Sequence, residues 1–470
     1  MNCKHASSIT LTIGNLLGCT SVCGKDIGMP CRVETDSRKI KEGDIFVALK
    51  GERLDGHDFI LDAVRRGARG VIFKQEEMPK YSELLQGKDV TLFGVQSPER
   101  AIVDAAVRYL SSFSSLKDII AITGSVGKTT TKDAIGRILQ GKYKAHVSAG
   151  NHNTLLGCSL TVLSAPSDTE YLVLEMGANA KGEIAEIADH FPPSMAVITS
   201  VEPVHLEGFG DIRGVLEAKL EIVTPHCEVL FINGDCSLLA EGVAALTDRP
   251  SRVITIGRDP SCMFKILDTK LHQDGHQYLR EVLIETPLGV AQLESKLWGE
   301  QHAMVVAVAT AVGYEIGLNF DDIASSLREM SSPKGRGALL KSDEGIMFVD
   351  ESYNASPVTV KAALKNLLGI PSRGRRIAVL GGMRELGGFE REFHREVFET
   401  AISVADVTIL YGKEWNNLSA NGKEVLHLHD IEEIVNYLKG ILRSGDIVLV
   451  KGSRVYEMER IYEWWSLNEL

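Results

Sequence analysis

The chain has 470 residues, which is enough for about three domains of ordinary size and several hydrophobic cores. Its 51 basic and 63 acidic side chains give a net charge of −12, which argues against a broad basic surface for nucleic acid or for an anionic membrane. Hydrophobic residues make up 44% and charged residues 24% of the chain, a composition that excludes extensive disorder.

The cysteines and the N-terminal sequence indicate the cellular compartment of the protein. Four of the eight cysteines, Cys3, Cys19, Cys23 and Cys31, lie near the N-terminus, but no His/Cys set with the usual metal-ligand spacing completes them, so we expect reduced thiols. The apolar stretch 9–17 is interrupted by polar residues and has no basic segment before it, so we expect no signal peptide. No apolar run approaches the ~18 residues of a membrane span. We therefore expect a cytoplasmic protein without stable membrane insertion.

Short apolar, β-branched runs alternate with helical patterns along most of the chain. The helical pattern is clear in 128–139, where apolar residues fall on one face. Alternation of this kind predicts α/β domains with mainly parallel sheets. The predicted strands are Asp44–Leu49, Gly70–Phe73, Ile119–Thr123, Tyr171–Glu175, Ala196–Ser200, Val229–Asn233, Arg376–Gly381, Val407–Tyr411 and Asp446–Lys451.

Two breaks divide the chain. The first is the polar run 111–115, and the second is 331–337, where Pro and Gly follow a predicted helix. These breaks predict three domains, over residues 1–115, 116–332 and 333–470.

The strongest motif is a glycine-containing loop between the predicted strand 119–123 and the predicted helix that begins at Lys128. This order turns backbone N–H groups and a helix N-terminus toward one point, where a polyphosphate can bind. Lys128 would neutralise the β- and γ-phosphates, and the hydroxyl of Thr129 is placed to bind Mg²⁺. Ile122 stands where the longer phosphate-loop motif has its first glycine, so the alternative is an ordinary strand–helix turn with a solvated lysine. The loop residues are Gly124, Ser125, Gly127, Lys128, Thr129 and Thr130.

Polar side chains also follow the ends of other predicted strands. Glu175 ends the strand 171–175, and His205 comes shortly after the strand 196–200. Because ligands of open parallel sheets lie beyond the carboxyl ends of the strands, we expect Thr129, Glu175 and His205 to converge and hold Mg²⁺. The alternative for His205 is a structural or surface histidine.

In their order along the chain, the motifs resemble those of the Mur ligases over essentially the whole length. The Ser352–Pro357 string, Ser-Tyr-Asn-Ala-Ser-Pro, resembles the branch of the family that adds a dipeptide. The other strings that carry the resemblance are 36–38, 43–49, 55–57, 123–130, 150–154, 175–179, 205–210, 217–219, 335–336, 379–387 and 451–454.

The resemblance implies a fold of three domains, with a central ATPase domain built on a parallel sheet with a phosphate loop and a C-terminal Rossmann-like domain. It implies that ATP and Mg²⁺ activate the terminal carboxylate of a UDP-N-acetylmuramoyl-tripeptide as an acyl phosphate, which the amine of D-alanyl-D-alanine attacks during peptidoglycan precursor synthesis. The first domain would bind the UDP-substrate, and the third would close over ATP and bind the dipeptide. The expected partners are these small molecules and no nucleic acid, and we expect a monomer.

The resemblance also implies roles for single residues. Lys219 matches a lysine that is carbamylated in the family and supports a second Mg²⁺; from the residues alone, it would lie on a solvated helix face beside Glu217 and Glu221. The implied catalytic residues are Lys128, His205 and Lys219, and the implied metal ligands are Thr129, Glu175, His205 and Lys219. Beyond the loop, the implied nucleotide contacts are Arg336 and Asn354. The implied substrate contacts are Ser37, Arg38, Asn151, Asn153, Asp350 and Ser356.

Some positions depart from the family pattern. Ala303 and Val306 stand where asparagines usually line the adenine side, Gly382 replaces a common aspartate, and Ala180 replaces a frequent histidine. Two alternatives therefore stay open: a sibling or paralogue that adds another amino acid or amine, and a catalytically silent nucleotide-binding protein. The chain lacks the Asp-Asn-Pro-Arg string of the sibling that adds meso-diaminopimelate.

Overall fold

The computed structural model describes residues 11–19, 21–51, 54–275 and 277–469, so Cys3 and the start of the stretch 9–17 lie outside the described residues. By their internal contacts the residues form two compact units. The first contains residues up to 122, 142–178 and 183–195, and the second contains 123–141, 179–182 and 196–470. In the described ranges, no helix has the length and apolar character needed to cross a bilayer.

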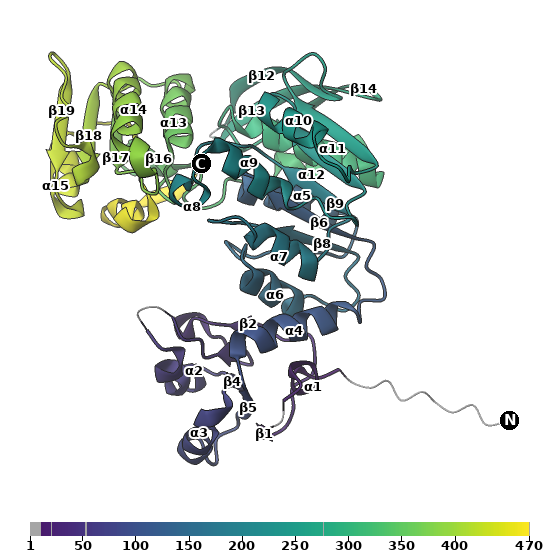
Figure 1. The fold of residues 1–470 in the computed structure, drawn as a ribbon. Coiled ribbons are helices and arrows are strands. Elements are labelled where there is room, and N and C mark those ends of the chain that lie inside the picture. The colour runs from purple at the N-terminus through teal and green to yellow at the C-terminus, as the bar shows by residue number, and fades with distance from the viewer. Residues whose placement is uncertain (1–10, 20, 52–53, 276, 470) are drawn as a thin grey trace. The chain divides into compact units, whose positions relative to one another are not determined.

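The N-terminal part of the first unit is a five-stranded sheet in the order β1-β5-β4-β3-β2, in which only β1 runs antiparallel to its neighbour (Figure 1). Its strands are β1 (Ser21–Cys23), β2 (Val33–Glu34), β3 (Ile45–Val47), β4 (Gly70–Lys74) and β5 (Thr91–Val95). Its helices are α1 (Ile13–Leu17), α2 (Ile60–Arg65), α3 (Met78–Leu84) and α4 (Pro98–Leu110).

The same unit continues into three parallel strands in the order β6-β8-β7. These strands are β6 (Asp118–Thr123), β7 (Ala145–Val147) and β8 (Tyr171–Glu175), and the helices between and after them are α6 (Leu155–Ser164) and α7 (Glu183–His190). The buried hydroxyl of Tyr109 on α4 donates to the carbonyl oxygen of Ala165 at 2.9 Å, which joins α4 to the end of α6.

In the second unit, six strands follow the order β14-β13-β12-β11-β10-β9. Strands β10 to β12 pair in parallel, whereas β12, β13 and β14 form an antiparallel extension. The strands are β9 (Met195–Ile198), β10 (Val229–Asn233), β11 (Arg252–Gly257), β12 (Phe264–Asp274), β13 (Gln277–Thr286) and β14 (Gly289–Ser295). The helices are α5 (Lys128–Gln140), α8 (Leu206–Phe209), α9 (Ile212–Leu220), α10 (Ser237–Ala244), α11 (His302–Ile316) and α12 (Phe320–Arg328).

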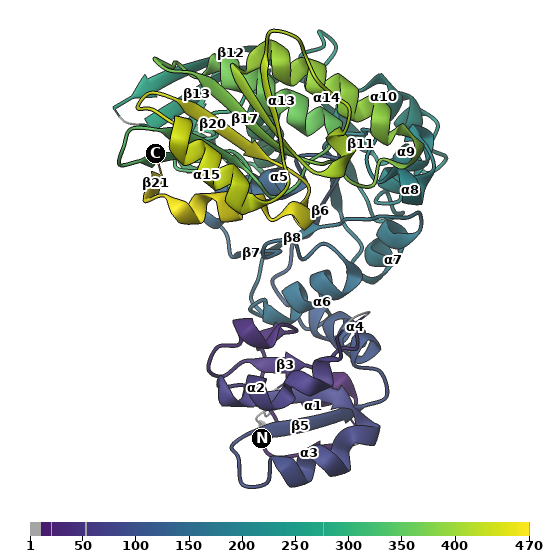
Figure 2. The same ribbon diagram turned by 90° about the vertical axis from the view of Figure 1, so that its left-hand side faces the viewer.

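The C-terminal part of the second unit is a seven-stranded sheet in the order β19-β18-β17-β20-β16-β15-β21. Helices α13 and α14 bury one face of this sheet, and α15 with the 3₁₀ segment η7 (Met458–Trp464) buries the other, because alternate strand residues join two separate cores (Figure 2). The strands are β15 (Ala338–Ser342), β16 (Met347–Glu351), β17 (Arg376–Gly381), β18 (Val407–Tyr411), β19 (Glu424–Leu428), β20 (Ile447–Lys451) and β21 (Leu467–Glu469). The helices are α13 (Pro357–Gly369), α14 (Glu390–Val404) and α15 (Ile431–Ile441).

The predicted bounds of β8, β10, β17 and β18 are confirmed residue for residue. The predicted strand 196–200 is too long, since β9 ends at Ile198 and the chain then turns into the loop described below. The antiparallel extension β12–β14 was not predicted.

Candidate active site

The glycine-containing loop joins the end of β6 to the start of α5, as the sequence predicts. Gly124 has φ of +141° and Gly127 has φ of +87°, conformations that glycine adopts without strain. Gly127 is the N-cap of α5, and among the described residues no side chain caps this helix end, which is the kind of terminus that phosphate groups bind. The local geometry therefore fits a polyphosphate.

The loop is fixed by two hydroxyl residues that follow β9, Thr199 and Ser200. The hydroxyl of Thr199 donates to the carbonyl oxygen of Val126 at 2.6 Å, and the hydroxyl oxygen of Ser200 accepts from the N–H of Val126 at 3.0 Å. A Cβ on Gly124 would lie only 2.1 Å from the hydroxyl oxygen of Thr199, so the loop is closed against this segment. The sequence analysis missed both residues, although they end the predicted strand 196–200.

Lys128 is folded back over the loop. Its ammonium group donates to the carbonyl oxygen of Gly124 at 2.7 Å and to that of Ser125 at 3.4 Å. The ammonium group is thus held against the carbonyl groups of the loop. Thr129 and Thr130 are buried in the first turn of α5, with 6% and 5% of their surface exposed.

His205 lies just before α8 and has an unusual backbone, with φ of +50°. Its Nδ1 is in contact with a carboxylate oxygen of Glu385, which follows β17. Burial lowers the pKa of His205, the carboxylate of Glu385 opposes that shift, and the positive charges of Lys128 and Lys219 add to it. The two lysines and the histidine therefore share one electrostatic environment.

Lys219 is buried within α9, with 1% of its surface exposed. Its ammonium nitrogen lies 5.1 Å from the centre of the Phe209 ring, within the range of a cation–π contact. The solvated-face alternative for Lys219 is wrong, and the glutamates on either side of it are directed elsewhere. Glu217 pairs with Lys181 at 2.5 Å, and Glu221 accepts from the N–H of Gly182 at 2.7 Å.

In the first unit, Glu175 ends β8 and is 2% exposed. Its carboxylate accepts from the side-chain amide of Asn153 at 3.1 Å, and the carbonyl oxygen of Asn153 accepts from the N–H of Gly177 at 2.7 Å. A Cβ on Gly177 would lie 2.9 Å from the Asn153 side chain. Two of the predicted site residues, Glu175 and Asn153, are thus in direct contact.

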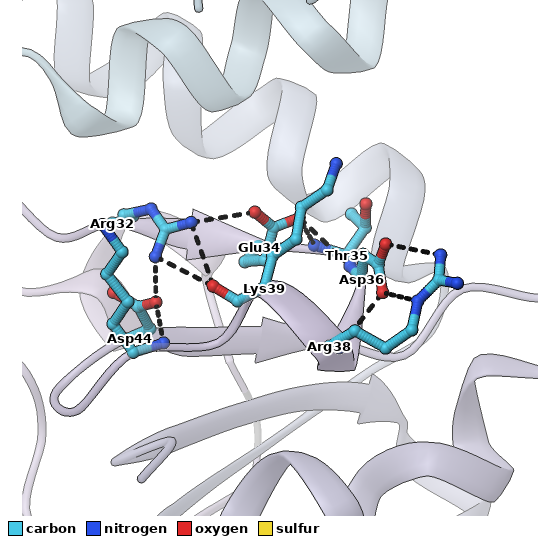
Figure 3. A network of polar contacts seen from close by, with 8 residues as sticks. Arg32, Glu34, Thr35, Asp36, Arg38, Lys39 and Asp44 are labelled. Atoms are coloured by element: carbon cyan, nitrogen blue, oxygen red, sulfur yellow. Dashed lines mark hydrogen bonds and ion pairs between the residues drawn. The ribbon is translucent and has the colours of Figure 1, made fainter. Parts of the chain in front are cut away.

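The segment around β2 carries a network of charged groups that Figure 3 shows from close by. The guanidinium of Arg32 pairs with Asp44 and, at 3.0 Å, with Glu34, whose other oxygen accepts from the N–H of Thr35 at 2.9 Å. Arg32 and Glu34 also line a cavity of about 390 Å³ together with Lys39, His146, Asn151 and Ser164. The predicted contact residue Asn151 therefore shares a cavity with charged residues that the sequence analysis did not single out.

The two predicted contacts beside this network differ in exposure. Ser37 is 6% exposed, and its hydroxyl donates to the carboxylate of Asp62 at 3.0 Å. The side chain of Arg38 is 81% exposed and pairs with Asp36 at 2.8 Å (Figure 3). Arg38 is thus available to an anionic ligand, whereas Ser37 is already engaged.

The predicted site residues of the C-terminal part lie before β15, in β16 and between β16 and α13. The guanidinium of Arg336 lies 4.1 Å from the centre of the Tyr353 ring. The buried carboxylate of Asp350 accepts from the N–H of Gly335 at 3.0 Å, and so holds the turn that carries Arg336. The carbonyl oxygen of Asn354 accepts from the ammonium of Lys451 at 3.0 Å. Ser356 forms the capping box at the start of α13 with Thr359.

The structure shows what surrounds three of the positions that depart from the family pattern, Ala303, Val306 and Gly382. Ala303 and Val306 are 1% and 0% exposed in α11, so both side chains pack in the core. A Cβ on Gly382 would lie 2.5 Å from a carboxylate oxygen of Glu414 and 2.7 Å from the hydroxyl oxygen of Tyr456. The space that a side chain at position 382 would need is filled by a glutamate from another strand end.

Three family models match successive parts of the chain: the Mur ligase family catalytic domain over residues 32–109, the Mur ligase middle domain over 122–313, and the Mur ligase glutamate ligase domain over 335–454. The chain belongs to the Mur ligase family, and it is an enzyme of the ligase class.

Curated relatives point to one branch of the family. The UDP-N-acetylmuramoyl-tripeptide–D-alanyl-D-alanine ligase of Bacillus subtilis is 31% identical over 91% of this chain and 92% of its own length. The enzyme of the same name from Escherichia coli is 30% identical over 93% of this chain and 94% of its own.

Solved structures agree with these relatives. The MurF ligase of Thermotoga maritima, in complex with ADP, matches with a TM-score of 0.76 and 30% identity over 92% of this chain and 96% of its own. MurF from Acinetobacter baumannii matches with a TM-score of 0.79 and 25% identity over 96% and 97%. The predicted α/β fold of the Mur ligases is confirmed.

Proposed function

We propose that this chain joins D-alanyl-D-alanine to a UDP-N-acetylmuramoyl-tripeptide in the cytoplasm, at the expense of ATP. The observation that carries the proposal is the loop between β6 and α5, in which the Lys128 ammonium donates to the carbonyl oxygen of Gly124 and no side chain of the described residues caps the N-terminus of α5. The named relatives and the solved MurF structures support the choice of substrates.

The reaction needs two bond exchanges. A carboxylate oxygen of the tripeptide attacks the γ-phosphorus of ATP and ADP leaves, which forms an acyl phosphate. The dipeptide amine, after losing a proton, then attacks the acyl carbon, and inorganic phosphate leaves from the tetrahedral intermediate. Because a carboxylate and a triphosphate repel each other, positive charge has to be placed between them.

We assign that charge to this chain's own residues. Lys128 and the N–H groups of Gly124, Ser125, Gly127, Thr129 and Thr130 would bind the phosphates. Thr129, Glu175 and His205 offer oxygen and nitrogen donors that fit Mg²⁺, which when bound supplies further neutralisation of the phosphates. Within the second unit, the fit rests on Thr129 in the first turn of α5 and on the side chain of His205, which is 29% exposed.

Lys219 would act as a carbamate. Its nitrogen is buried in the unit that holds Lys128 and His205, where an ammonium group is costly, and carbamylation converts it to an anion that can support a second Mg²⁺.

The three predicted domains would divide the substrates. Residues 1–115 would bind the UDP group through Ser37 and Arg38, and Asn151 and Asn153 would contact the same substrate. Residues 333–470 would meet the nucleotide through Arg336 and Asn354 and the dipeptide through Asp350 and Ser356. The cavity beside Arg32 supports a site for an anionic substrate in the first unit.

A phosphate-release assay on the full chain tests the proposal. With ATP and Mg²⁺, release should require both the UDP-tripeptide and D-alanyl-D-alanine. Release with a free diamino acid in place of the dipeptide would identify a sibling ligase instead. Absence of release with every amine tested would favour a catalytically silent nucleotide-binding protein.

A further inference from the structure

The loops after β17 and β20 lie side by side in the C-terminal part, and they lead to opposite faces of its sheet. These two strands are parallel neighbours. From β17 the chain continues to α14 on one face of the sheet, and from β20 it continues to η7 on the other face. In open parallel sheets, ligands bind beyond the carboxyl ends of two such strands, because the diverging loops leave a crevice there.

The loop after β17 is rigidly held at this point. The N–H of Gly382 donates to the carbonyl oxygen of Tyr411 at 2.9 Å, and the N–H of Met383 donates to Nε2 of His394 at 3.0 Å. The N–H of Arg384 donates to the hydroxyl oxygen of Ser453 at 3.0 Å, which joins the loop after β17 to the loop after β20. Residue 384 therefore has a fixed backbone at the carboxyl ends of β17 and β20.

The side chain of Arg384 is fixed at one end only. Its Nη1 donates to Oε1 of Glu414, whose other carboxylate oxygen accepts from the hydroxyl of Tyr456. The side chain of Glu414 is 1% exposed, whereas that of Arg384 is 45% exposed. Within the described part of the chain, Glu414 is the sole hydrogen-bond partner of this guanidinium, so its Nε and Nη2 edge remains available to a second acceptor.

The anchoring carboxylate depends on glycine at two strand ends. A Cβ on Gly412 would lie 2.6 Å from Oε2 of Glu414, nearly as close as one on Gly382. Both glycines thus make room for Glu414 beneath the loop. A buried carboxylate that holds a half-exposed guanidinium by one edge is a preorganised receptor for a planar anion.

We propose that Arg384 binds the carboxylate of the incoming amine substrate, so that the C-terminal part of the chain selects a dipeptide or amino acid with a free carboxyl end. This inference rests on the proposed function. The Nε and Nη2 groups match the two oxygens of a carboxylate. A singly charged carboxylate suits the site better than a polyphosphate, because the negative charges of Glu414 and Glu390 lie close to the guanidinium.

Steady-state kinetics with D-alanyl-D-alanine and with its C-terminal carboxamide test this contact. For the unaltered chain, the carboxamide should have a KM about 10- to 100-fold higher than the dipeptide, the loss expected for a hydrogen bond between charged groups. Arg384→Gln should raise the KM for the dipeptide by a similar factor. It should leave the KM for the carboxamide, the KM for ATP and kcat within about twofold.

Two further variants separate binding from folding. Arg384→Lys keeps the charge without the two-pronged geometry, and it should recover only part of the affinity for the dipeptide. Arg460→Gln is the matched control, because Arg460 is an exposed arginine of the same domain that also pairs with a glutamate, Glu457; its kinetics should be unchanged.

Each outcome bears on one proposal. If the unaltered chain uses the dipeptide but Arg384→Gln raises both KM values equally, or raises that for ATP instead, the carboxylate contact is overturned. If the unaltered chain uses no amine with a carboxyl end, the proposed function itself fails.

Discussion

Nδ1 of His205 is in contact with the carboxylate of Glu385, and both residues have a left-handed backbone, with φ of +50° and +64°. Such conformations cost about 1–3 kcal/mol each in residues other than glycine and persist only where the surroundings enforce them. The pair joins the residue before α8 to the loop after β17. A proposed metal ligand is therefore oriented by a carboxylate that stands next to Arg384 in the chain.

Replacing Glu385 with glutamine should weaken Mg²⁺ binding at His205. A carboxylate that orients a ligating histidine typically contributes 10- to 100-fold to metal affinity or activity, so we expect Glu385→Gln to lower the rate by about that factor at limiting Mg²⁺. Rates measured over a range of Mg²⁺ concentrations check this. Glu392→Gln, an exposed glutamate on α14, serves as the control. An unchanged Mg²⁺ requirement would contradict the orienting role.

Adding a methyl group to Gly124 should abolish ATP turnover. The new Cβ would lie 2.1 Å from the Thr199 hydroxyl oxygen, and φ of +141° is strained for alanine, so the phosphate loop has to open. Gly87→Ala is the matched control, because Gly87 has φ of +77° with no atom within 4 Å of its Cβ position. Gly87→Ala should cost about 1–3 kcal/mol of stability, measured by urea unfolding, and leave turnover unchanged. Full activity of Gly124→Ala would place the phosphates elsewhere.

Removing the Lys128 ammonium should stop the reaction without unfolding the protein. Lys128→Ala deletes the charge that neutralises the phosphates and loses two hydrogen bonds to loop carbonyls at the surface of the site. Phosphate release should fall below detection while the circular dichroism spectrum is unchanged. Lys142→Ala, just beyond the other end of α5, should retain normal activity. Normal activity of Lys128→Ala would end the assignment.

The carbamate at Lys219 predicts chemical rescue. Lys219→Ala removes the long arm that would carry the anion, so activity should be lost, and short carboxylic acids should restore part of it by occupying the vacated space. The comparison variant is Lys181→Ala, which removes an exposed lysine paired with Glu217. Activity of Lys219→Ala should rise with added acetate, whereas that of Lys181→Ala should not. Loss without rescue at any acid concentration would argue for a cationic role.

Asp446 predicts how stability depends on pH. Burial alone would raise its pKa, but hydrogen bonds from Arg375 and from the N–H of Arg443 lower it below the ordinary value of 3.8. A carboxyl group with a lowered pKa stabilises the fold above its unfolded pKa, and this contribution is lost as pH falls through the folded value. Asp446→Asn should therefore cost about 1–3 kcal/mol at pH 7 and clearly less near pH 3, measured by urea unfolding. An equal cost at both values would contradict this assignment.

Strands that are buried on both faces were the easiest to predict. Tyr171–Glu175 and Val407–Tyr411 are mainly apolar, as is typical of strands that are buried on both faces, and nearly all of their residues are buried. The extension β12–β14 was missed, since β12 combines exposed and buried positions with a register shift between Ile266 and Asp268. Local patterns do not reveal such pairings.

The site residues also divide into those that belong to local motifs, which were predicted, and those that depend on contacts between distant segments, which were not. The loop 124–130 is a local motif and was found, whereas the hydrogen bond between Asn153 and Glu175 was not predicted, although both residues were named as site residues. The burial of Lys219 was not foreseen, because charged neighbours at helical spacing also describe a solvated face. Arg384 and Glu414 were not identified because their contact joins two strand ends far apart in the chain.

The hydrogen bonds of Thr199 and Ser200 to Val126 connect the phosphate loop to the segment that leads to His205. A nucleotide bound at the loop would therefore affect the position of His205 and, through it, that of Glu385. Because Glu385 is next to Arg384, a bound nucleotide would then affect the proposed site of the amine substrate. We therefore expect ATP to bind before the amine.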